Sequence, residues 1–216
     1  IIGAPIGVAI GLSSAVSMIC MIPADVSFAT SAQRIFAGSN SFSLIAIPFF
    51  ILAGNIMNNG GIATRLVNCA KVISGRMPGA LAQSNVVANM LFGAISGSGA
   101  AAAAAMGGTI GPLEEKEGYD KNYSTAVNVA SAPVGMLIPP SNTMIVYSSV
   151  AGSVSIAALF MAGYIPGLLW GGAVMILAGI MAKKRGYQAE QRVQVKVALK
   201  TFWQAIPSLL LIVIVI

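Results

Sequence analysis

The amino-acid sequence predicts an all-α protein that crosses a membrane several times, and three observations lead to that prediction. Hydrophobic residues make up 56% of the 216 residues, charged residues make up only 8%, and the mean hydropathy is +0.84. A soluble domain usually carries about 25% charged residues. The apolar residues are gathered in runs interrupted by glycine, proline or polar residues, and roughly 20 apolar residues can span a bilayer.

Each apolar run is a candidate helix. The runs cover residues 3–22, 44–58, 80–94, 99–112, 123–137, 141–150 and 156–182, and a last one begins at residue 206. Because the sequence starts and stops inside apolar runs, we expect a fragment of a longer protein. The first run has no basic flank and no clear small-residue cleavage pattern, so we interpret it as a truncated transmembrane helix and not as a signal peptide.

Two places in the chain combine apolar runs with an interruption. Residues 80–94 and 99–112 are each too short to span, and they meet at the sequence SGSG of residues 96–99, which predicts a re-entrant helical hairpin. Residues 123–150 are long enough to cross, but the sequence IPPSN at 138–142 interrupts them. This pattern predicts a broken helix.

The distribution of basic residues supports the hairpin. If the hairpin enters and leaves on one side and the broken helix counts as one span, the loops at residues 65–76, 114–121 and 183–200 share one side of the membrane. That side holds eleven of the twelve basic residues, namely Arg65, Lys71, Arg76, Lys116, Lys121, Lys183, Lys184, Arg185, Arg192, Lys196 and Lys200, and Arg34 is the exception. Such a bias marks the cytoplasmic side. If residues 80–112 crossed the membrane once, the basic loop at 183–200 would lie on the opposite side from the one at 65–76.

The segment at residues 190–204 follows a basic cluster and mixes apolar with basic residues. Its members are Val193, Val197, Phe202 and Trp203 among Arg192, Lys196 and Lys200. We expect an amphipathic helix on the cytoplasmic surface, directly before the last apolar run.

Composition also argues against several classes of function. The net charge of +6 does not indicate nucleic-acid binding, because the basic residues flank apolar runs and are not interleaved with an exposed aromatic platform. Cys20 and Cys69 are far apart and the sequence has no histidine, so a zinc or redox site has no ligand set. The usual Ser–His arrangement is impossible as well. We predict no enzyme, no cofactor and no transition metal.

The first interruption offers polar groups at membrane depth. Non-helical backbone persists there only where protein, water or a ligand satisfies it. The hydroxyls of Ser96 and Ser98 and the free carbonyls are hard oxygen ligands, and the helix that restarts at Gly99 aims its partly positive N-terminus into the same space.

The second interruption offers a similar set. Pro139 and Pro140 cannot donate hydrogen bonds, which leaves the carbonyls of residues 135–138 free. Ser141 and Asn142 follow as side-chain ligands and helix caps. Sites made only of oxygen atoms suit Na⁺, and the helix N-termini suit an anionic substrate.

Coupling to Na⁺ is expected in preference to H⁺. The acidic residues Glu114, Glu115, Glu117 and Asp120 all fall in one polar loop, so we expect no buried carboxylate for a proton relay. That loop, residues 113–124, is interpreted as a solvated connector.

Plainer interpretations stay open at each of these places. A patch of glycine and serine in a membrane helix is most often a packing surface, and a pair of prolines is most often a kink. Asn85, Asn89 and Asn128 are expected to join helices by hydrogen bonds and not to bind substrate.

The sequence around both interruptions resembles a known family, the large membrane (M) subunit of tripartite ATP-independent periplasmic (TRAP) transporters, in its N-terminal half. The matching stretches are SFSLIAIPFFILAGNIMNNGGIATRLV, LFGAISGSGAAAAAAMGG, GYDKNYSTA, APVGMLIPPSNTMIVYSSVAG and LFMAGYIPGLLW. Their order and spacing cover nearly the whole chain.

This resemblance implies an elevator-type secondary transporter built from two inverted repeats, of which this chain holds one. It implies Na⁺-coupled import of an organic acid across the bacterial inner membrane, with a small membrane (Q) subunit and a periplasmic substrate-binding (P) protein as partners. The form APVGMLIPPSN is similar to members that handle sugar acids such as sialic acid.

The resemblance also implies the site residues and the domains. The Na⁺ ligands would be Ser96, Gly97, Ser98, Gly135, Pro139, Pro140, Ser141, Asn142 and Thr143, and the substrate contacts would be Ser98, Gly99 and Asn142. We expect scaffold helices and a cytoplasmic connector at 1–78. Half of a transport domain follows at 79–150, with the hairpin at 79–112 and the broken helix at 122–150. A scaffold helix, the amphipathic arm and the start of the next span follow at 151–216.

Two other functions remain as alternatives. One is an elevator carrier for dicarboxylates that works without a binding protein. The other belongs to a different class, a membrane scaffold that transports nothing.

Overall fold

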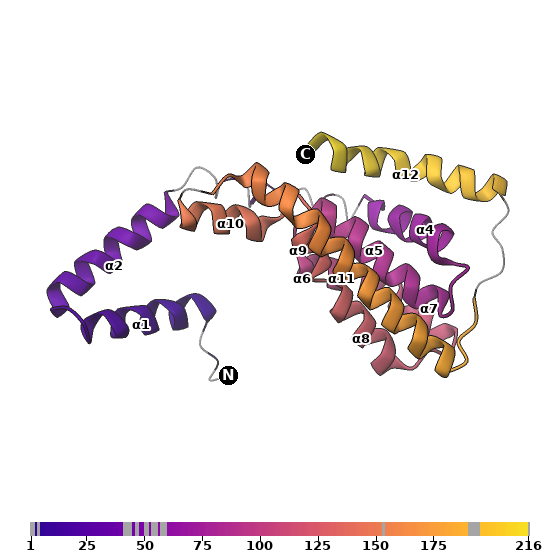
Figure 1. The fold of residues 1–216 in the computed structure, drawn as a ribbon, viewed down its shortest axis with the longest axis horizontal. Coiled ribbons are helices and arrows are strands. Elements are labelled where there is room, and N and C mark those ends of the chain that lie inside the picture. Colours follow the sequence, from indigo (N-terminus) through magenta and orange to yellow (C-terminus); the bar gives the residue numbers. More distant parts are fainter. Residues whose placement is uncertain are drawn as a thin grey trace. The chain divides into compact units, whose positions relative to one another are not determined.

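The computed structural model describes residues 3, 5–40, 45, 48–49, 52, 56, 60–152, 154–189 and 195–215, and the regular structure in these ranges is helical (Figure 1). The chain divides into two compact units, Ile1–Ile45 and Ala46–Ile216. The predicted all-α class is therefore confirmed for the described residues. The run predicted at 44–58 lies mostly outside them.

The first unit consists of α1 (Ile6–Ile19) and α2 (Ala24–Ser39), which pack against each other. Each helix begins directly after a proline, Pro5 or Pro23, whose fixed φ and missing N–H suit the start of a helix. α1 confirms the helix predicted within residues 3–22. No apolar run predicted α2.

The second unit begins with α4 (Ile62–Ser74), which corrects the interpretation of residues 65–76 as a loop. Ala63, Leu66, Val67 and Ala70 follow helical spacing and are all buried, while Arg65 on the same helix is exposed. The basic residues of this segment led to the prediction of a loop, but the apolar residues between them make the segment an amphipathic helix. α4 packs on α5 and α12.

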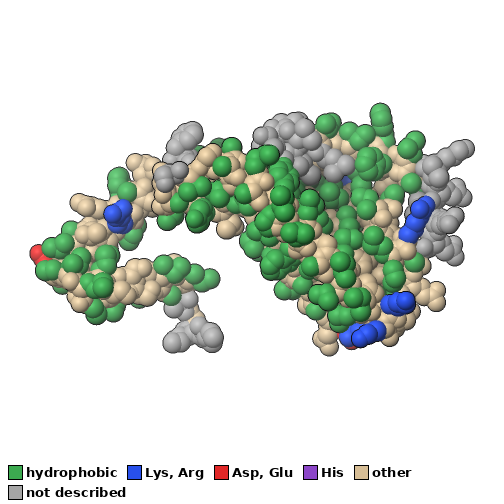
Figure 2. Space-filling model, viewed as in Figure 1, with side chains coloured by type: hydrophobic (Ala, Val, Ile, Leu, Met, Phe, Trp, Pro, Cys, Tyr) green, Lys and Arg blue, Asp and Glu red, His purple; other side chains and the backbone are tan. Residues whose placement is uncertain are grey.

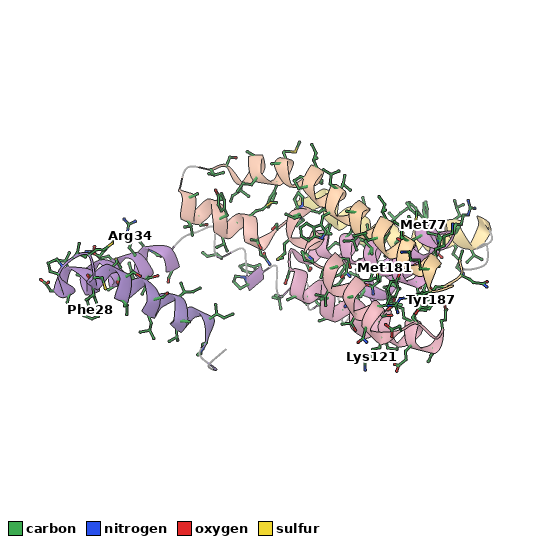
Figure 3. The ribbon with its side chains drawn as sticks, turned by 60° about the horizontal axis from the view of Figure 1, so that its bottom comes forward. Phe28, Arg34, Met77, Lys121, Met181 and Tyr187 are labelled. Carbon is green, nitrogen blue, oxygen red and sulfur yellow. The ribbon has the colours of Figure 1, made fainter. Side chains whose placement is uncertain are left out.

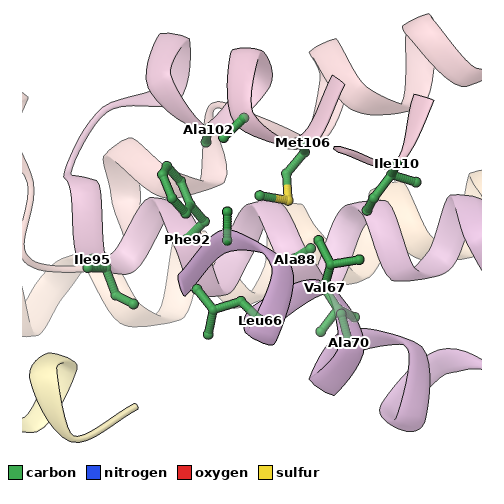
Figure 4. Close-up of a cluster of buried hydrophobic side chains, with 12 residues drawn as sticks. Leu66, Val67, Ala70, Ala88, Phe92, Ile95, Ala102, Met106 and Ile110 are labelled. Carbon is green, nitrogen blue, oxygen red and sulfur yellow. The ribbon is translucent and has the colours of Figure 1, made fainter. Parts of the chain in front are cut away.

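The predicted hairpin is present as α5 (Ala80–Ser96) and α6 (Gly99–Thr109), joined by residues 97 and 98. Their facing surfaces form a buried apolar cluster with α4, shown in Figure 4. Phe92 and Ala88 of α5 lie there with Ala102 and Met106 of α6. The alanines of α6 let the two helices approach closely, as small residues do between membrane helices.

The predicted broken helix consists of three pieces, α8 (Lys121–Ser131), α9 (Val134–Leu137) and α10 (Asn142–Ala151). The main bend is 48° and lies between α9 and α10. Pro139 and Pro140 occupy that break and are joined by a cis peptide bond. A smaller interruption at Pro133, which the sequence prediction did not separate, divides α8 from α9.

The long helix α11 (Ile156–Lys184) packs its small residues inward against α5, α8 and α9 (Figure 1). Gly163 and Gly167 lie against the backbone and side chains of Leu137 and Ile138, where a Cβ atom would collide. Its large residues, such as Ile165 and Leu169, are exposed. Figure 2 shows hydrophobic side chains covering much of this unit, with the visible Lys and Arg toward one end. This arrangement is typical of a helix that faces lipid.

α12 (Val195–Val215) is one continuous helix, with Pro207 inside it. The sequence predicted two pieces there, an amphipathic helix up to residue 204 and a separate apolar run from 206. Residues 190–194 lie outside the described ranges. The described part therefore joins both predicted pieces in one helix.

Length and composition single out one possible membrane span among the described helices, α11. The pair formed by residues Lys121–Leu137 and Asn142–Ala151 qualifies as a second if its two bent parts count together. α5 and α6, with 17 and 11 residues, are both shorter than the roughly 20 residues of a span, as predicted for the hairpin.

The loop at residues 113–124 is not a solvated connector, which corrects the prediction. Part of it forms the short helix α7 (Gly111–Lys116), and Glu114, Tyr119 and Tyr123 are buried. The prediction that no acidic residue is buried is therefore wrong, because Glu114 is only 1% exposed. Ala178 and Ala182 of α11 pack on the two tyrosines, whereas α5, α6 and α8 pack on α7, and local polarity reveals neither contact.

Candidate functional site

The hairpin tip is a tight turn stabilised by its own serines. Gly97 ends α5 with a φ of +63°, a left-handed conformation that glycine adopts without strain. Ser98 caps α6, its hydroxyl accepting from the N–H of Ala101 at 3.3 Å. The Ser96 hydroxyl lies 3.4 Å from both the N and the O atoms of Ser98. The tip therefore carries hydroxyl and carbonyl oxygens next to a helix N-terminus.

The break between α9 and α10 repeats this arrangement. Ser141 caps α10, accepting from the N–H of Met144 at 3.3 Å, and its hydroxyl donates to the carbonyl of Met136. Ser141 is buried, and so are Pro139 and Pro140. The cap satisfies one N–H at the start of α10 and one carbonyl at the end of α9.

The two interruptions touch each other. The N–H of Asn142 donates to the carbonyl of Gly97 at 3.3 Å. A Cβ atom on Gly97 would lie 2.9 Å from the carbonyl oxygen of Pro140, so only glycine allows this approach. The Asn142 Oδ1 atom is buried and has no hydrogen-bond partner among the described residues. An unsatisfied acceptor in this position can take a cation or a donor from a ligand.

The predicted site residues are brought into contact only in part. Gly97 of the tip contacts Pro140 and Asn142 of the break, and Ser96, Ser98, Pro139 and Ser141 are their neighbours in the sequence. Gly99 lies against Ala132 and Met136. Gly135 instead contacts the backbone of Gly93 on α5. The Thr143 side chain is exposed. Binding of Na⁺ or substrate by any of these residues stays a prediction.

The predicted hydrogen bonds of the asparagines between helices are confirmed. The Asn89 amide nitrogen lies 2.9 Å from Asn85 Oδ1, 2.9 Å from Asn128 Oδ1 and 2.8 Å from Ser131 Oγ. Asn128 in turn donates to the carbonyl of Ala103 at 2.9 Å. These bonds connect α5, α8 and α6 through the interior of the unit.

A cluster of three tyrosines lies at the end of this unit away from the hairpin tip. The sequence patterns did not predict it. The rings of Tyr119 and Tyr187 stack with centroids 4.2 Å apart, and the N–H of Asp120 donates to the Tyr187 hydroxyl at 2.8 Å. Figure 3 shows Tyr187 and Lys121 at this end. Arg185 pairs with Asp120 at 3.1 Å. The Tyr123 backbone N–H lowers the pKa of Asp120, and Arg185 lowers it further.

Comparison with known proteins assigns the chain. The family model described as "Tripartite ATP-independent periplasmic transporter, DctM component" matches residues 1–216. An uncharacterized protein of Salmonella typhimurium, YgiK, is 53% identical over 100% of this chain, and the match covers 49% of that relative.

Two relatives with stated transport roles are similar over almost the whole chain. The C4-dicarboxylate TRAP transporter large permease protein DctM of Vibrio cholerae is 39% identical over 100% of the chain, which covers 47% of it. The sialic acid TRAP transporter large permease protein SiaM of Vibrio cholerae is 37% identical over 99% of the chain, which covers 49% of it. The chain thus spans about half the length of these relatives, and it belongs to the DctM component family of tripartite ATP-independent periplasmic transporters.

Proposed function

We propose that the full-length protein carrying this chain imports an organic acid across the bacterial inner membrane and couples the import to Na⁺. Family membership supports transport and argues against enzymatic activity, because the family consists of TRAP transporter permeases. Following the family's tripartite organisation, the proposed partners are a small membrane (Q) subunit and a periplasmic substrate-binding (P) protein.

The contact between the hairpin tip and the broken helix is the observation that carries the proposal. It unites two serine-capped helix N-termini, at Ser98 and Ser141, with carbonyl oxygens at the ends of α5 and α9. Carbonyl and hydroxyl oxygens are ligands for Na⁺, and helix N-termini attract a carboxylate. A site with both kinds of group fits a cation and an acid that bind together.

The substrate is proposed to carry a carboxylate, with sialic acid or another sugar acid as the first candidate. Relatives described as C4-dicarboxylate and sialic acid permeases are 39% and 37% identical, so overall similarity does not separate them. The proposed movement is of the elevator type, in which the hairpin and the broken helix shift together against a scaffold.

Uptake measurements test this proposal directly. The full-length permease and its small partner are reconstituted in proteoliposomes and supplied with labelled sialic acid or a labelled C4-dicarboxylate. The Na⁺ gradient and the binding protein are included or omitted independently of each other. We expect uptake only with both present. Uptake with Na⁺ alone would instead identify a carrier that needs no binding protein, and uptake independent of Na⁺ would refute the coupling.

Disulfide cross-linking tests the contact between tip and break. Ser98→Cys with Ser141→Cys, in a background lacking Cys20 and Cys69, should form a cross-link under mild oxidation. The control pair is Ser98→Cys with Thr109→Cys. Ser98 caps the start of α6 and Thr109 ends it, about 16.5 Å away at 1.5 Å per residue, so this pair should not cross-link. Equal cross-linking of both pairs would refute the contact.

A further inference from the structure

Glu114 is a buried acid in the chain segment that follows the hairpin. It lies on α7, in the connection between the hairpin and the broken helix, and is 1% exposed, whereas Glu115 and Glu117 beside it are exposed. In the part of the chain that the structure describes, neither carboxylate oxygen has a hydrogen-bond partner and no ion pair includes Glu114. A buried carboxylate is unfavourable unless something neutralises it or hydrogen-bonds to it.

Other unpartnered polar atoms surround the same space. Glu114 lines a cavity of about 360 Å³ together with Asn85 of α5 and Ser124 and Asn128 of α8. The Ser124 hydroxyl and the Asn85 amide nitrogen are also buried, and both lie beside the Glu114 carboxylate without the geometry of a hydrogen bond. Three helices therefore contribute unsatisfied polar atoms to one cavity. A bound group of suitable chemistry would satisfy several of them at once.

The charges around the cavity favour a single positive charge as its occupant. Glu115 and Lys121 line it as well, and both are exposed, so their charges offset each other and Glu114 adds one negative charge. Tyr119 also lines the cavity. A divalent ion would leave an uncompensated positive charge beside the buried carboxylate.

Near neutral pH, Glu114 is present in both its protonated and its ionised form. Burial raises its pKa to about 7, and the neighbouring Ser124 and Asn85 side chains offset part of the increase. The ionised form thus exists at physiological pH, and it needs a counter-charge inside the cavity.

We propose that the cavity beside Glu114 is a binding site for one small monovalent cation, held by the Glu114 carboxylate and the Ser124 hydroxyl. In the occupied site, the Asn85 amide nitrogen donates to the same carboxylate and orients it. The Asn85 oxygen accepts from Asn89, which also contacts Asn128, so the site adjoins the polar chain inside the unit. This site is distinct from the predicted tip ligands, and the proposal does not depend on the proposed function.

Infrared difference spectroscopy tests the site without any transport. The full-length permease with its small partner, in lipid at pH 8, is exchanged between choline chloride and NaCl, LiCl or KCl of equal ionic strength. We expect Na⁺ to shift a carboxylate stretching band that Glu114→Gln removes. The control Glu115→Gln changes a carboxylate that lines the same cavity but is exposed, and it should keep the shift.

A second variant keeps the test decisive if Glu114→Gln fails to fold. Ser124→Ala retains the carboxylate and removes one proposed ligand, so the Na⁺ concentration for half of the shift should rise by about tenfold. At pH 6, Na⁺ should also remove the carbonyl band of the protonated acid.

Two outcomes would overturn the proposal. A Glu114 band that none of the three cations changes would show that the cavity holds no cation. A Glu114 band that shifts on Lys121→Gln without added cation would show that the Lys121 ammonium group occupies the cavity. Because neither measurement requires uptake, failure here is distinguishable from failure of the proposed transport function.

Discussion

The hairpin tip and the Glu114 cavity are both polar places inside an apolar helical unit, and they are built in opposite ways. At the tip, two interrupted helices expose backbone oxygens, and Ser98, Ser141 and Asn142 add uncharged side chains. At the cavity, the helices are intact and a buried carboxylate supplies the charge. The polar groups at the tip therefore come from the geometry of the backbone, whereas the charge at the cavity comes from the burial of one side chain.

The largest effect is expected where backbones touch behind the tip. A Cβ atom at position 135 would overlap the backbone of Gly93, which cannot rotate away. Gly135→Ala should therefore lower the free energy of unfolding by about 3 kcal/mol or more. Gly108→Ala is the matched control, because its Cβ would meet no atom within 4 Å and should add up to about 1 kcal/mol through helix propensity. Thermal unfolding in detergent distinguishes the two, and equal melting temperatures would contradict the close contact.

The next effect concerns the buried charge and depends on pH. Folding raises the pKa of Glu114 from 4.5 to about 7, so the folded state holds a proton that the unfolded state releases between these values. Stability from this group is therefore lost as the pH rises from 4.5 to 7 and stays low above 7. The glutamine variant lacks this loss. Between pH 5 and pH 8, Glu114→Gln should therefore gain up to roughly 3 kcal/mol in free energy of unfolding relative to the unchanged protein.

This comparison is made in choline chloride, which supplies no small inorganic cation to the cavity. Glu115→Gln is the control, because its exposed carboxylate should give no such difference between pH 5 and pH 8. Parallel melting curves for Glu114→Gln and the unchanged protein at both pH values would contradict the prediction.

A smaller effect is expected for the tip serine. Ser98→Ala removes one oxygen from the predicted Na⁺ site and should raise the half-saturating Na⁺ concentration for uptake about tenfold, equivalent to about 1.4 kcal/mol. Ser155→Ala removes the same kind of helix cap, from α11, and should leave the Na⁺ response unchanged. Identical Na⁺ responses in both variants would exclude Ser98 from the site.

The smallest effect belongs to the ion pair in the aromatic cluster. The side chains of Arg185 and Asp120 are 40% and 41% exposed, so water and salt screen their attraction. Arg185→Gln should lower the melting temperature less than any destabilising variant above, and high salt should reduce the difference further. A drop as large as that of Gly135→Ala would show that the cluster holds the unit together.

Sequence patterns anticipated the tip better than the cavity, for physical reasons. Glycine, serine and proline disrupt a helix through local geometry, so residues 96–99 and 138–142 marked both interruptions. Glu114 is buried because α5, α6 and α8 pack around the short helix α7, and no local sequence pattern expresses this packing. Similarly, the helix α4 was obscured because Arg65 and Lys71 dominate a segment whose apolar residues nevertheless follow helical spacing.

The contact between Gly97 and Asn142 brings four helix ends together, two of each sign. The ends of α5 and α9 carry partial negative charge, and the starts of α6 and α10 carry partial positive charge. The four partial charges form a quadrupole, whose field cancels at a distance and is strong only within the contact. A lone ion gains little from such a field, because attraction to two ends is offset by repulsion from the other two. A neighbouring pair of opposite charges gains from all four ends, so the geometry itself favours joint occupancy.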